Sequence, residues 1–262
     1  RCKVTNLPWV VDEAVLSSTF AIPRVHLLND LQAAAYGMLF LDDSELVSLT
    51  PGLTLDHKKS FAVIAAGTGL GEALLVWDGE KHIPMASEGG HTSFAPRTDV
   101  EYALLKFLQA RHGQHVSWER LVAGPGLGAI YAFLKEHHAQ HGGPLESPRV
   151  RDRIAAEDDG SVIGAEAIAG SDDLCVAVVD LFCALYGAEA GNLALKGLAT
   201  GGVFVGGGVA PKLLPILQRS SFIENFRSKG RFRELLESVP VVVASNPKAP
   251  LIGAARFAAR LS

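Results

Sequence analysis

The sequence predicts an α/β fold, and three features of its apolar pattern support this. Short apolar runs have the length of strands, and they lie at residues 61–66, 73–77, 202–205 and 239–244. Longer segments with helical apolar spacing separate these runs, and the longest covers 172–196. A glycine-rich turn, Gly67–Gly71, joins the first two runs and indicates a hairpin. Strands that alternate with helices are typical of α/β proteins, and the hairpin adds antiparallel pairing to the sheet.

The first sixty residues predict one strand, one helix and a connector. Residues 24–28 form a short apolar run, and the alanine-rich segment 31–41 has a good helix composition. Asn29 and Asp30 are therefore expected at the carboxyl end of a strand, where open α/β sheets bind ligands. Residues 42–59 are polar, contain proline and glycine, and are interpreted as a polar connector.

Capping signals place the helices that follow. Thr98 and Asp99 precede a helical pattern that runs to Gly113, and Pro148 follows Ser147 at the start of another helix. The segment 137–143 is rich in histidine and is expected to be a polar loop. Further helices are expected at 117–122, 124–139, 161–169, 172–196, 212–218, 222–226 and 252–261.

Composition narrows the classes of function. The chain has 262 residues, a net charge of −4 and no dominant basic stripe, which argues against a nucleic-acid partner. The most apolar long segment, 175–195, contains Asp180, Glu189 and Asn192, so we interpret it as a buried helix and not a membrane span. The three cysteines show neither metal-ligand nor disulfide spacing, which indicates a reduced, cytoplasmic setting.

Asp30 and the turn at Gly67–Gly71 are the first candidates for chemistry. A carboxylate at position 30 can accept the proton of a substrate hydroxyl, or the Asn29-Asp30 pair merely caps the helix that follows. The turn can present backbone N–H groups to a phosphate, with Thr68 as a hydroxyl donor, or it is an ordinary hairpin turn. It matches neither a Walker loop nor the dinucleotide fingerprint.

Polar side chains and glycines further along the chain supply the other candidates. Glu88 and His91 flank two glycines and can bind the hydroxyls of a ligand, or they belong to a solvated loop. Glu119 either joins such a site or complements the dipole of the helix near whose start it lies. Gly206–Gly208 follows an apolar strand and either approaches a nucleotide or forms a tight turn. The histidines of 137–141 are either metal ligands or a surface cluster.

The order of these motifs resembles that of bacterial glucokinases, which belong to the hexokinase and actin-like superfamily. The resemblance covers essentially the whole chain. It implies a two-lobed, actin-like ATPase (ribonuclease H-like) fold with mixed sheets and a small lobe incomplete at its N-terminus. Residues 1–40 with 250–262 would form the small lobe, and 41–249 the large lobe. The motifs are Leu27-Leu-Asn-Asp30, Ala66-Gly-Thr-Gly-Leu-Gly71, Glu88-Gly-Gly-His91, Glu119-Arg120, Gly124-Pro-Gly-Leu127, Gly191-Asn-Leu-Ala-Leu195 and Gly201-Gly-Val-Phe-Val-Gly-Gly-Gly208.

The resemblance also implies an activity, the transfer of the γ-phosphoryl group of ATP, with Mg²⁺, to the 6-hydroxyl of glucose. Asp30 would be the catalytic base. The sugar and the nucleotide would be its small-molecule partners, and a homodimer its assembly, away from membranes. The implied sugar-binding residues are Asn29, Glu88, His91 and Glu119, and the implied nucleotide-binding residues are Gly67, Thr68, Gly69, Gly71, Gly206, Gly207 and Gly208.

One departure from the family pattern leaves a second hypothesis open. Glucokinases begin with a first phosphate loop of the Asp-x-Gly-Gly-Thr type, and no such segment occurs at the start of this sequence. We therefore expect that an N-terminal portion is missing from it. The alternative function is a sugar-binding or regulatory module that does not phosphorylate, because phosphoryl transfer depends on positioning and on charge neutralisation.

Overall fold

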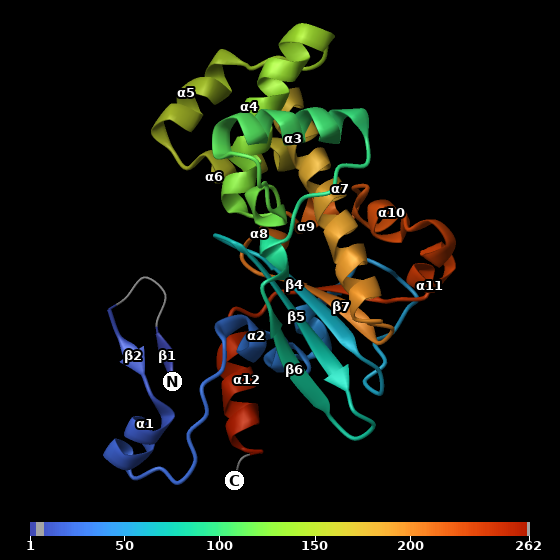
Figure 1. Ribbon diagram of the computed structural model, residues 1–262. Coiled ribbons are helices and arrows are strands. Elements are labelled where there is room, and N and C mark those ends of the chain that lie inside the picture. The colour runs from blue at the N-terminus through green and yellow to red at the C-terminus, as the bar shows by residue number, and fades with distance from the viewer. Residues whose placement is uncertain (4–7, 261–262) are drawn as a thin grey trace.

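A mixed six-stranded sheet lies at the centre of the computed structural model, which describes residues 1–3 and 8–260 (Figure 1). The strands β4, β7 and β8 run parallel, whereas β3, β5 and β6 are antiparallel to their neighbours. The α/β prediction and the predicted hairpin are confirmed. In spatial order the strands are β3 (Leu46–Ser48), β8 (Val241–Ala244), β7 (Gly202–Gly206), β4 (Phe61–Ala66), β5 (Leu70–Trp77) and β6 (His82–Ser87).

The burial of each strand follows its place in the sheet. The parallel strands β7 and β8 are buried along their whole length, which explains their unbroken apolar sequences. The edge strand β6 alternates at its start, with His82 and Pro84 buried and Ile83 and Met85 exposed. Proline is tolerated there because an edge strand has N–H groups that need no partner strand.

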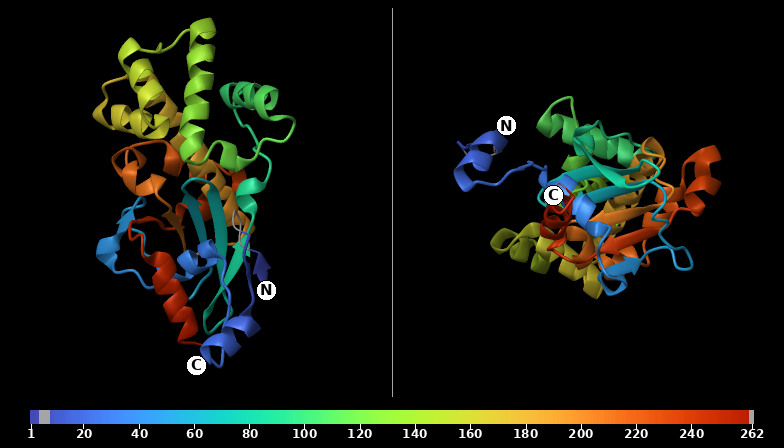
Figure 2. Two further views of the ribbon diagram at one scale, coloured as in Figure 1. Left: turned by 90° about the vertical axis from the view of Figure 1, so that its left-hand side faces the viewer. Right: turned by 90° about the horizontal axis from the view of Figure 1, so that it is seen from below.

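Helices cover both faces of the sheet (Figures 1 and 2). The long helix α7 (Asp173–Lys196) lies on one face, and its residues join the larger apolar core. The helices α2 (Asp30–Met38) and α12 (Ala249–Ala258) share a second core with the other face. A layer of helices lies on each side of the sheet, and the carboxyl ends of its three parallel strands, β4, β7 and β8, lie at one rim, where ligands can approach.

Helices α2 and α12 cross at two glycines. A Cβ atom added at Gly37 would lie 1.9 Å from the carbonyl oxygen of Ala249, and one added at Gly253 would lie 1.8 Å from that of Ala33. No side chain fits in either place, so the two backbones are in direct contact. This contact ties the C-terminal helix to the helix that begins at Asp30.

A group of helices extends beyond the sheet at the far end of α7 (Figure 1). The prediction for α3 is confirmed, because Thr98 caps its start and Gly113 ends it with a φ of 86°. The helices of this group are α3 (Asp99–His112), α4 (Gly124–His141), α5 (Pro148–Ala156) and α6 (Asp159–Ala169). The shorter elements of the fold are β1 (Cys2–Lys3), β2 (Val10–Val11), α1 (Glu13–Phe20), α8 (Val209–Lys212), α9 (Leu214–Leu217), α10 (Phe222–Arg227), α11 (Arg233–Glu237) and the 3-10 turns η1 (Asp43–Glu45), η2 (Gly89–His91), η3 (Trp118–Arg120) and η4 (Gly230–Phe232).

Within the described part of the chain, one helix, α7, is long and apolar enough to span a membrane. Of its most apolar window, 72% is buried inside the molecule. Its apolar surface is therefore occupied by the protein core, as expected from the charged and amide side chains along it.

The structure corrects four sequence predictions. Residues 24–28 are not a strand: the structure assigns them no regular secondary structure, and the Leu27 N–H donates to the Glu13 carboxylate. The connector 42–59 contains the strand β3, which pairs with β8. The strand β6 had no predicted counterpart. The histidine-rich segment is helical, because α4 continues to His141 and ends at Gly142. One turn of this helix separates His137 from His141, and their rings stack at 4.4 Å.

Candidate active site

Asn29 and Asp30 lie at the start of α2, where the sequence left open a choice between a helix cap and a chemical role. The Asn29 side chain is the cap of α2, because its Oδ1 accepts the N–H groups of Leu31 at 3.0 Å and Gln32 at 3.2 Å. Asp30 is the first residue of the helix, and its carboxylate is exposed while one oxygen accepts the Leu31 N–H at 2.7 Å. The cap role therefore belongs to Asn29, and the Asp30 carboxylate remains open to a ligand.

The first turn of α2 is held against the hairpin by two contacts. A Cβ atom added at Gly71 would lie 2.7 Å from the Leu31 side chain, so the glycine makes room for that leucine. The Gln32 side-chain amide donates to the Pro84 carbonyl on β6 at 2.7 Å. These contacts place Asp30 beside the end of the glycine turn that joins β4 to β5.

Glu88, His91 and Glu119 form one cluster, although 31 residues separate the first from the last. The two ring nitrogens of His91 each lie 3.8 Å from a carboxylate oxygen, one of Glu88 and one of Glu119. The loops that carry them are joined by the Trp118 N–H, which donates to the Thr92 carbonyl at 3.1 Å. Imidazole and carboxylate groups spaced in this way can bind several hydroxyls side by side.

Glu119 also links this cluster to the glycine turn. Its Oε2 accepts the Leu70 N–H at 3.0 Å, and a Cβ at Gly69 would lie 2.5 Å from the same oxygen. Ser117 was expected to cap a helix through Val122. Instead a 3-10 turn, η3, covers Trp118–Arg120, and the Glu119 carboxylate points to Leu70 rather than to the start of its own turn. The glycine at 69 is thus explained by the close approach of a side chain.

A buried carboxyl lies below the loop that carries Glu88 and His91. Glu72 on β5 is 1% exposed, and neither of its oxygens has a hydrogen-bond partner among the described residues. A Cβ atom at Gly89 would lie 1.9 Å from Glu72 Oε2, so the loop rests directly on the carboxyl. Burial, and next the nearby Glu189 carboxylate, raise the pKa of Glu72 to about 8, against a partial opposing effect of Lys196. No feature of the sequence separated this residue from an ordinary strand glutamate.

A cavity of about 730 Å³ opens on the other side of the glycine turn. Three predicted nucleotide residues line it: Gly67, Thr68 and Gly208. The predicted residues Gly69, Gly71, Gly206 and Gly207 do not line it. The remaining walls come from residues to which the sequence analysis gave no site role, namely Gly124, Pro125, Leu127, Asp158, Asp159, Gly160, Ser161, Gly164, Ala165, Ile168, Val209, Lys212 and Leu213.

Backbone contacts shape the turns of this cavity. The Gly67 N–H donates to the Gly69 carbonyl at 2.8 Å, and the Gly67 carbonyl accepts the Gly124 N–H at 2.7 Å. Gly207 has a φ of 80°, and an added Cβ would lie 2.2 Å from the Ala66 carbonyl oxygen. The start of the 18-residue helix α4, at Gly124 and Pro125, faces the cavity. Helix N-termini and glycine turns bind phosphate groups through N–H groups that have no intramolecular acceptor, and here the N–H groups of Gly67 and Gly124 already donate to backbone carbonyls.

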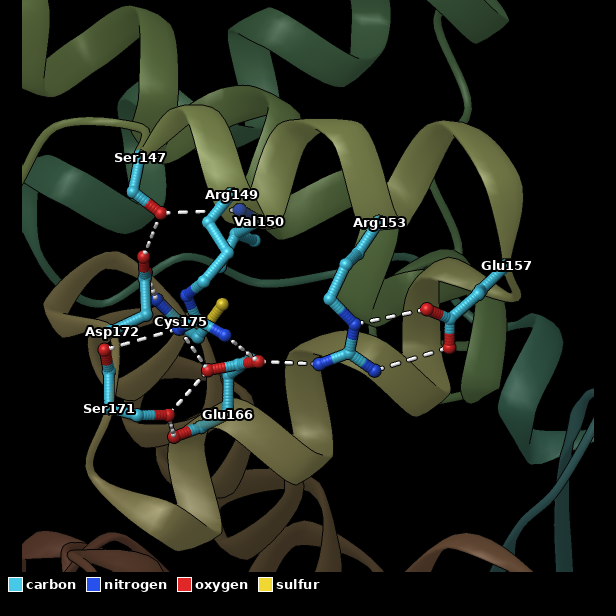
Figure 3. Close-up of polar contacts among 9 residues, drawn as sticks. All are labelled: Ser147, Arg149, Val150, Arg153, Glu157, Glu166, Ser171, Asp172 and Cys175. Carbon is cyan, nitrogen blue, oxygen red and sulfur yellow. Dashed lines mark hydrogen bonds and ion pairs between the residues drawn. The ribbon is translucent and has the colours of Figure 1, made fainter.

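The wall formed by α6 is anchored by an ion-pair network (Figure 3). The buried Glu166 carboxylate accepts hydrogen bonds from Arg149 and Arg153 of α5 and from the Ser171 hydroxyl. Hydrogen bonds from Arg149 and next from Ser171 lower the pKa of Glu166 to about 2. Next to Ser171, Asp172 accepts a hydrogen bond from the Ser147 hydroxyl at 2.7 Å, at the start of α7.

A start signal for α6 was present in the sequence. The Asp158 side chain caps the helix by accepting the Ser161 N–H at 2.8 Å, so α6 begins at Asp159, two residues before its predicted start. Lys212 is the one cation among the described residues that line the cavity. It lies in the stretch Gly208-Val-Ala-Pro-Lys212, whose glycine was predicted but whose lysine was not.

Comparisons of the whole chain with known proteins identify its family. The sequence model of a family described as Glucokinase matches residues 1–261. A glucokinase of Trichormus variabilis is 44% identical, with 99% of this chain and 78% of the relative covered, and one of Synechocystis is 38% identical, with 99% and 75% covered. A glucokinase structure from an Antarctic psychrotroph superposes with a TM-score of 0.82 at 33% identity, over 96% of this chain and 74% of that one.

A more distant structure shares the fold alone. A ROK family glucokinase from Streptomyces griseus, solved in complex with glucose and AMPPNP, gives a TM-score of 0.60 at 21% identity. It covers 94% of this chain and 71% of that one. The two-lobed kinases of this kind have the actin-like ATPase fold, in accord with the mixed sheet described above. Taken with the family match along the whole sequence, these findings show that the chain belongs to the glucokinase family.

Proposed function

We propose that this protein transfers the γ-phosphoryl group of ATP to the 6-hydroxyl of glucose. The single observation that carries the proposal is the place of the glycine turn 67–71. It lies between the cavity, which Gly67 lines, and the cluster of Glu88, His91 and Glu119, while the helix of Asp30 packs on Gly71. A nucleotide and a sugar bound on the two sides of one turn would meet at this carboxylate.

The sugar would bind in front of the carboxylate cluster. Glu88, His91 and Glu119 would hold its ring hydroxyls, and Asn29 would contribute from the start of α2. The exposure of Glu88, whose side chain is 84% exposed, and of His91 leaves both available to a ligand. Glu119 is 33% exposed and keeps its second oxygen on the Leu70 N–H, which fixes its orientation.

Asp30 would act as the catalytic base. The 6-hydroxyl oxygen forms a bond to the γ-phosphorus while the bond from that phosphorus to the leaving ADP oxygen breaks, and the hydroxyl proton passes to the Asp30 carboxylate. A sugar hydroxyl is too weak an acid to lose its proton before the reaction, so the carboxylate orients the nucleophile first and accepts the proton as the new bond forms.

The nucleotide would occupy the cavity. Gly67 and Thr68, with Gly69 and Gly71 shaping the turn, would hold the phosphates, and the Gly206–Gly208 turn would face the adenosine. Among the described residues no group of three histidine, cysteine or acidic side chains is placed to hold a metal ion. Mg²⁺ suits such a site, because it retains waters and binds mainly through substrate phosphates. Bound there, it would neutralise phosphate charge.

Two assays test the proposal against its alternative, a sugar-binding module without kinase activity. Calorimetry with glucose measures binding, and a coupled assay measures the release of ADP. Glucose binding with glucose-dependent ADP release supports the kinase, whereas binding without release supports the alternative. None of the matching relatives named above favours the alternative, since each is described as a glucokinase.

The Asp30→Asn variant tests the catalytic role directly. We expect kcat to fall about 10²–10⁴-fold while the Kd for glucose stays within a factor of three, because the amide retains the shape but cannot accept the proton. Asp99→Asn is the matched control, since Asp99 is also an exposed carboxylate at the first position of a helix that its neighbour caps. Full turnover by Asp30→Asn would show that another group is the base.

We further propose that the protein is a cytoplasmic homodimer whose two lobes, 1–40 with 250–262 and 41–249, close on the substrates. Cys175 and Cys183 are buried and unpaired, which suits a reducing compartment. Light scattering after size exclusion would give the assembly, and a mass of 27.8 kDa, that of one chain, would contradict the dimer.

A further inference from the structure

One buried hydroxyl connects the two glycine turns of the proposed nucleotide site. Tyr186 lies in the middle of α7 and has no exposed surface. Its oxygen accepts the Ala66 N–H at 3.2 Å and lies 3.3 Å from the carbonyl oxygens of Ile64 and Gly206. The first two partners are on β4 and the third is on β7, so the hydroxyl proton is directed between two strands.

The sheet itself does not join the strands at this point. Pairing between β4 and β7 runs from Phe61 with Gly202 to Ala65 with Gly206 and ends there. The next N–H along β4, that of Ala66, donates to the Tyr186 hydroxyl instead of to a strand. The two chains then separate, β4 into the hairpin turn and β7 into Gly207 and α8. Strand ends that diverge in this way form the crevice where α/β sheets bind ligands.

Both diverging chains enter the cavity within two residues. Gly67 follows Ala66 directly, and Gly208 is the second residue after Gly206. The distance between the two turns is therefore set at their bases, by the hydroxyl on one side and by the contact of Gly207 with the Ala66 carbonyl on the other. We propose that Tyr186 is a positioning residue, which holds the two turns at the spacing that the nucleotide requires; this inference rests on the proposed function.

The ring of Tyr186 and its hydroxyl have separable roles. The ring packs edge-on against Phe182 at 5.8 Å and Phe222 at 5.4 Å, and a phenylalanine would keep both contacts. Removal of the hydroxyl alone leaves the Ala66 N–H without this hydrogen-bond acceptor and releases the Gly206 carbonyl. The sugar cluster has no contact with this hydroxyl, so a change there should affect the nucleotide and not the sugar.

The Tyr186→Phe variant tests the proposal through its effect on the two substrates. We expect the KM for ATP and the Kd for ADP to rise about tenfold, in line with the loss of a buried hydrogen bond. The KM for glucose should stay within a factor of two, and kcat within a factor of three. Tyr131→Phe is the matched control, because it removes the hydroxyl of another buried tyrosine, which among the described residues bonds to the Glu146 carboxylate, and it should leave both KM values unchanged.

The outcomes separate this inference from the proposed function. If wild-type protein binds no ADP, the nucleotide site fails and the inference fails with it. If wild-type protein binds ADP and Tyr186→Phe binds it equally well, only the inference is overturned. A parallel rise in both KM values would indicate a general structural defect and would also overturn it.

Hydrogen exchange of the wild-type protein provides a second test that needs no variant. We expect ADP to slow amide hydrogen exchange in the segments 64–68 and 204–208 together, because the Tyr186 hydroxyl oxygen joins their backbones. Glucose alone should leave both segments unchanged. A response to ADP in one segment without the other would contradict the coupling, whatever the stability of Tyr186→Phe.

Discussion

The proposed sugar cluster and the proposed nucleotide cavity are built in different ways, although they share one glycine turn. The sugar cluster consists of charged side chains with long contacts, such as the 3.8 Å between His91 and Glu119. The turns at the base of the cavity are set by backbone contacts: a Cβ atom added at Gly207 would lie 2.2 Å from the Ala66 carbonyl oxygen, and one added at Gly124 would lie 3.2 Å from the Gly67 carbonyl oxygen. We therefore expect substitutions that change charge to disturb sugar binding, and substitutions that add bulk to disturb nucleotide binding.

The two regions also differ in the buried side chain on which each of them packs. The sugar loop rests on Glu72, a titratable carboxyl whose pKa is raised to about 8 by burial and the nearby Glu189. The nucleotide turns rest on Tyr186, whose hydroxyl pKa burial raises far above its usual range. Glu72, beneath the sugar loop, therefore changes its charge between pH 7 and 9, whereas Tyr186, beneath the nucleotide turns, does not.

The largest effect is expected from Gly207→Ala, which tests the steric side of the comparison. The added Cβ would lie 2.2 Å from the Ala66 carbonyl oxygen, and the φ of 80° is unfavourable for alanine, so we expect ADP binding to be lost at millimolar concentration. Glucose binding should persist. Calorimetry with each ligand measures both.

Gly113→Ala is the matched control for the backbone strain. Its φ of 86° is similar, but nothing lies within 4 Å of an added Cβ, and the residue ends α3 away from the cavity. The control should lose only about 1 kcal/mol of stability and no nucleotide affinity. Normal ADP binding by Gly207→Ala would remove the steric contrast between the two regions.

A smaller effect is expected from Glu119→Gln, which tests the electrostatic side. The amide can still contact the Leu70 N–H through its oxygen, but it weakens a charge-assisted bond to a sugar hydroxyl worth about 2 kcal/mol. The kcat/KM for glucose should fall roughly 30-fold with the KM for ATP unchanged. Glu136→Gln, on the exposed surface of α4, is the control. A rise in the KM for ATP of similar size would show that the two regions do not act separately.

The smallest effect concerns the pH dependence of stability and the Glu72→Gln variant. The folded pKa of Glu72 is above its unfolded value, so its contribution to stability is complete below about pH 4.5 and is lost as the pH rises toward 8. From pH 7 to 9 the wild type should lose on the order of 1 kcal/mol of stability through this group. Glutamine does not titrate, so urea unfolding of the variant should lack this loss.

Glu101→Gln serves as the control for that series. Glu101 is also buried, but Arg97 pairs with it at 2.5 Å, so its removal should lower stability by a similar amount at pH 7 and pH 9. If Glu72→Gln and wild type lose stability in parallel between these pH values, the buried carboxyl does not titrate there and the contrast with Tyr186 fails.

Local signals in the sequence were sufficient for most helices. Thr98 and Gly113 predicted both ends of α3, and Ser147 with Pro148 predicted the start of α5. The signals failed where a neighbour decides the structure. Residues 24–28 have a strand composition but no partner strand, and β3 and β6 are edge strands formed by pairing with β8 and β5. Strand formation needs a partner that sequence periodicity does not identify.

Turns, caps and apolar runs are local properties of a sequence. The α/β class, the hairpin with its glycine turn and the motifs that carry the proposed chemistry could therefore be predicted before the structure was known. Only the tertiary structure decided which of those glycines line the cavity, that α6 and Lys212 complete it, and that Glu72 and Tyr186 are buried beneath the two substrate regions. Burial and long-range contacts are not local properties. The Tyr186 hydroxyl of α7 and the Ala66 N–H of β4 are 120 positions apart, and no local sequence pattern predicts that they meet.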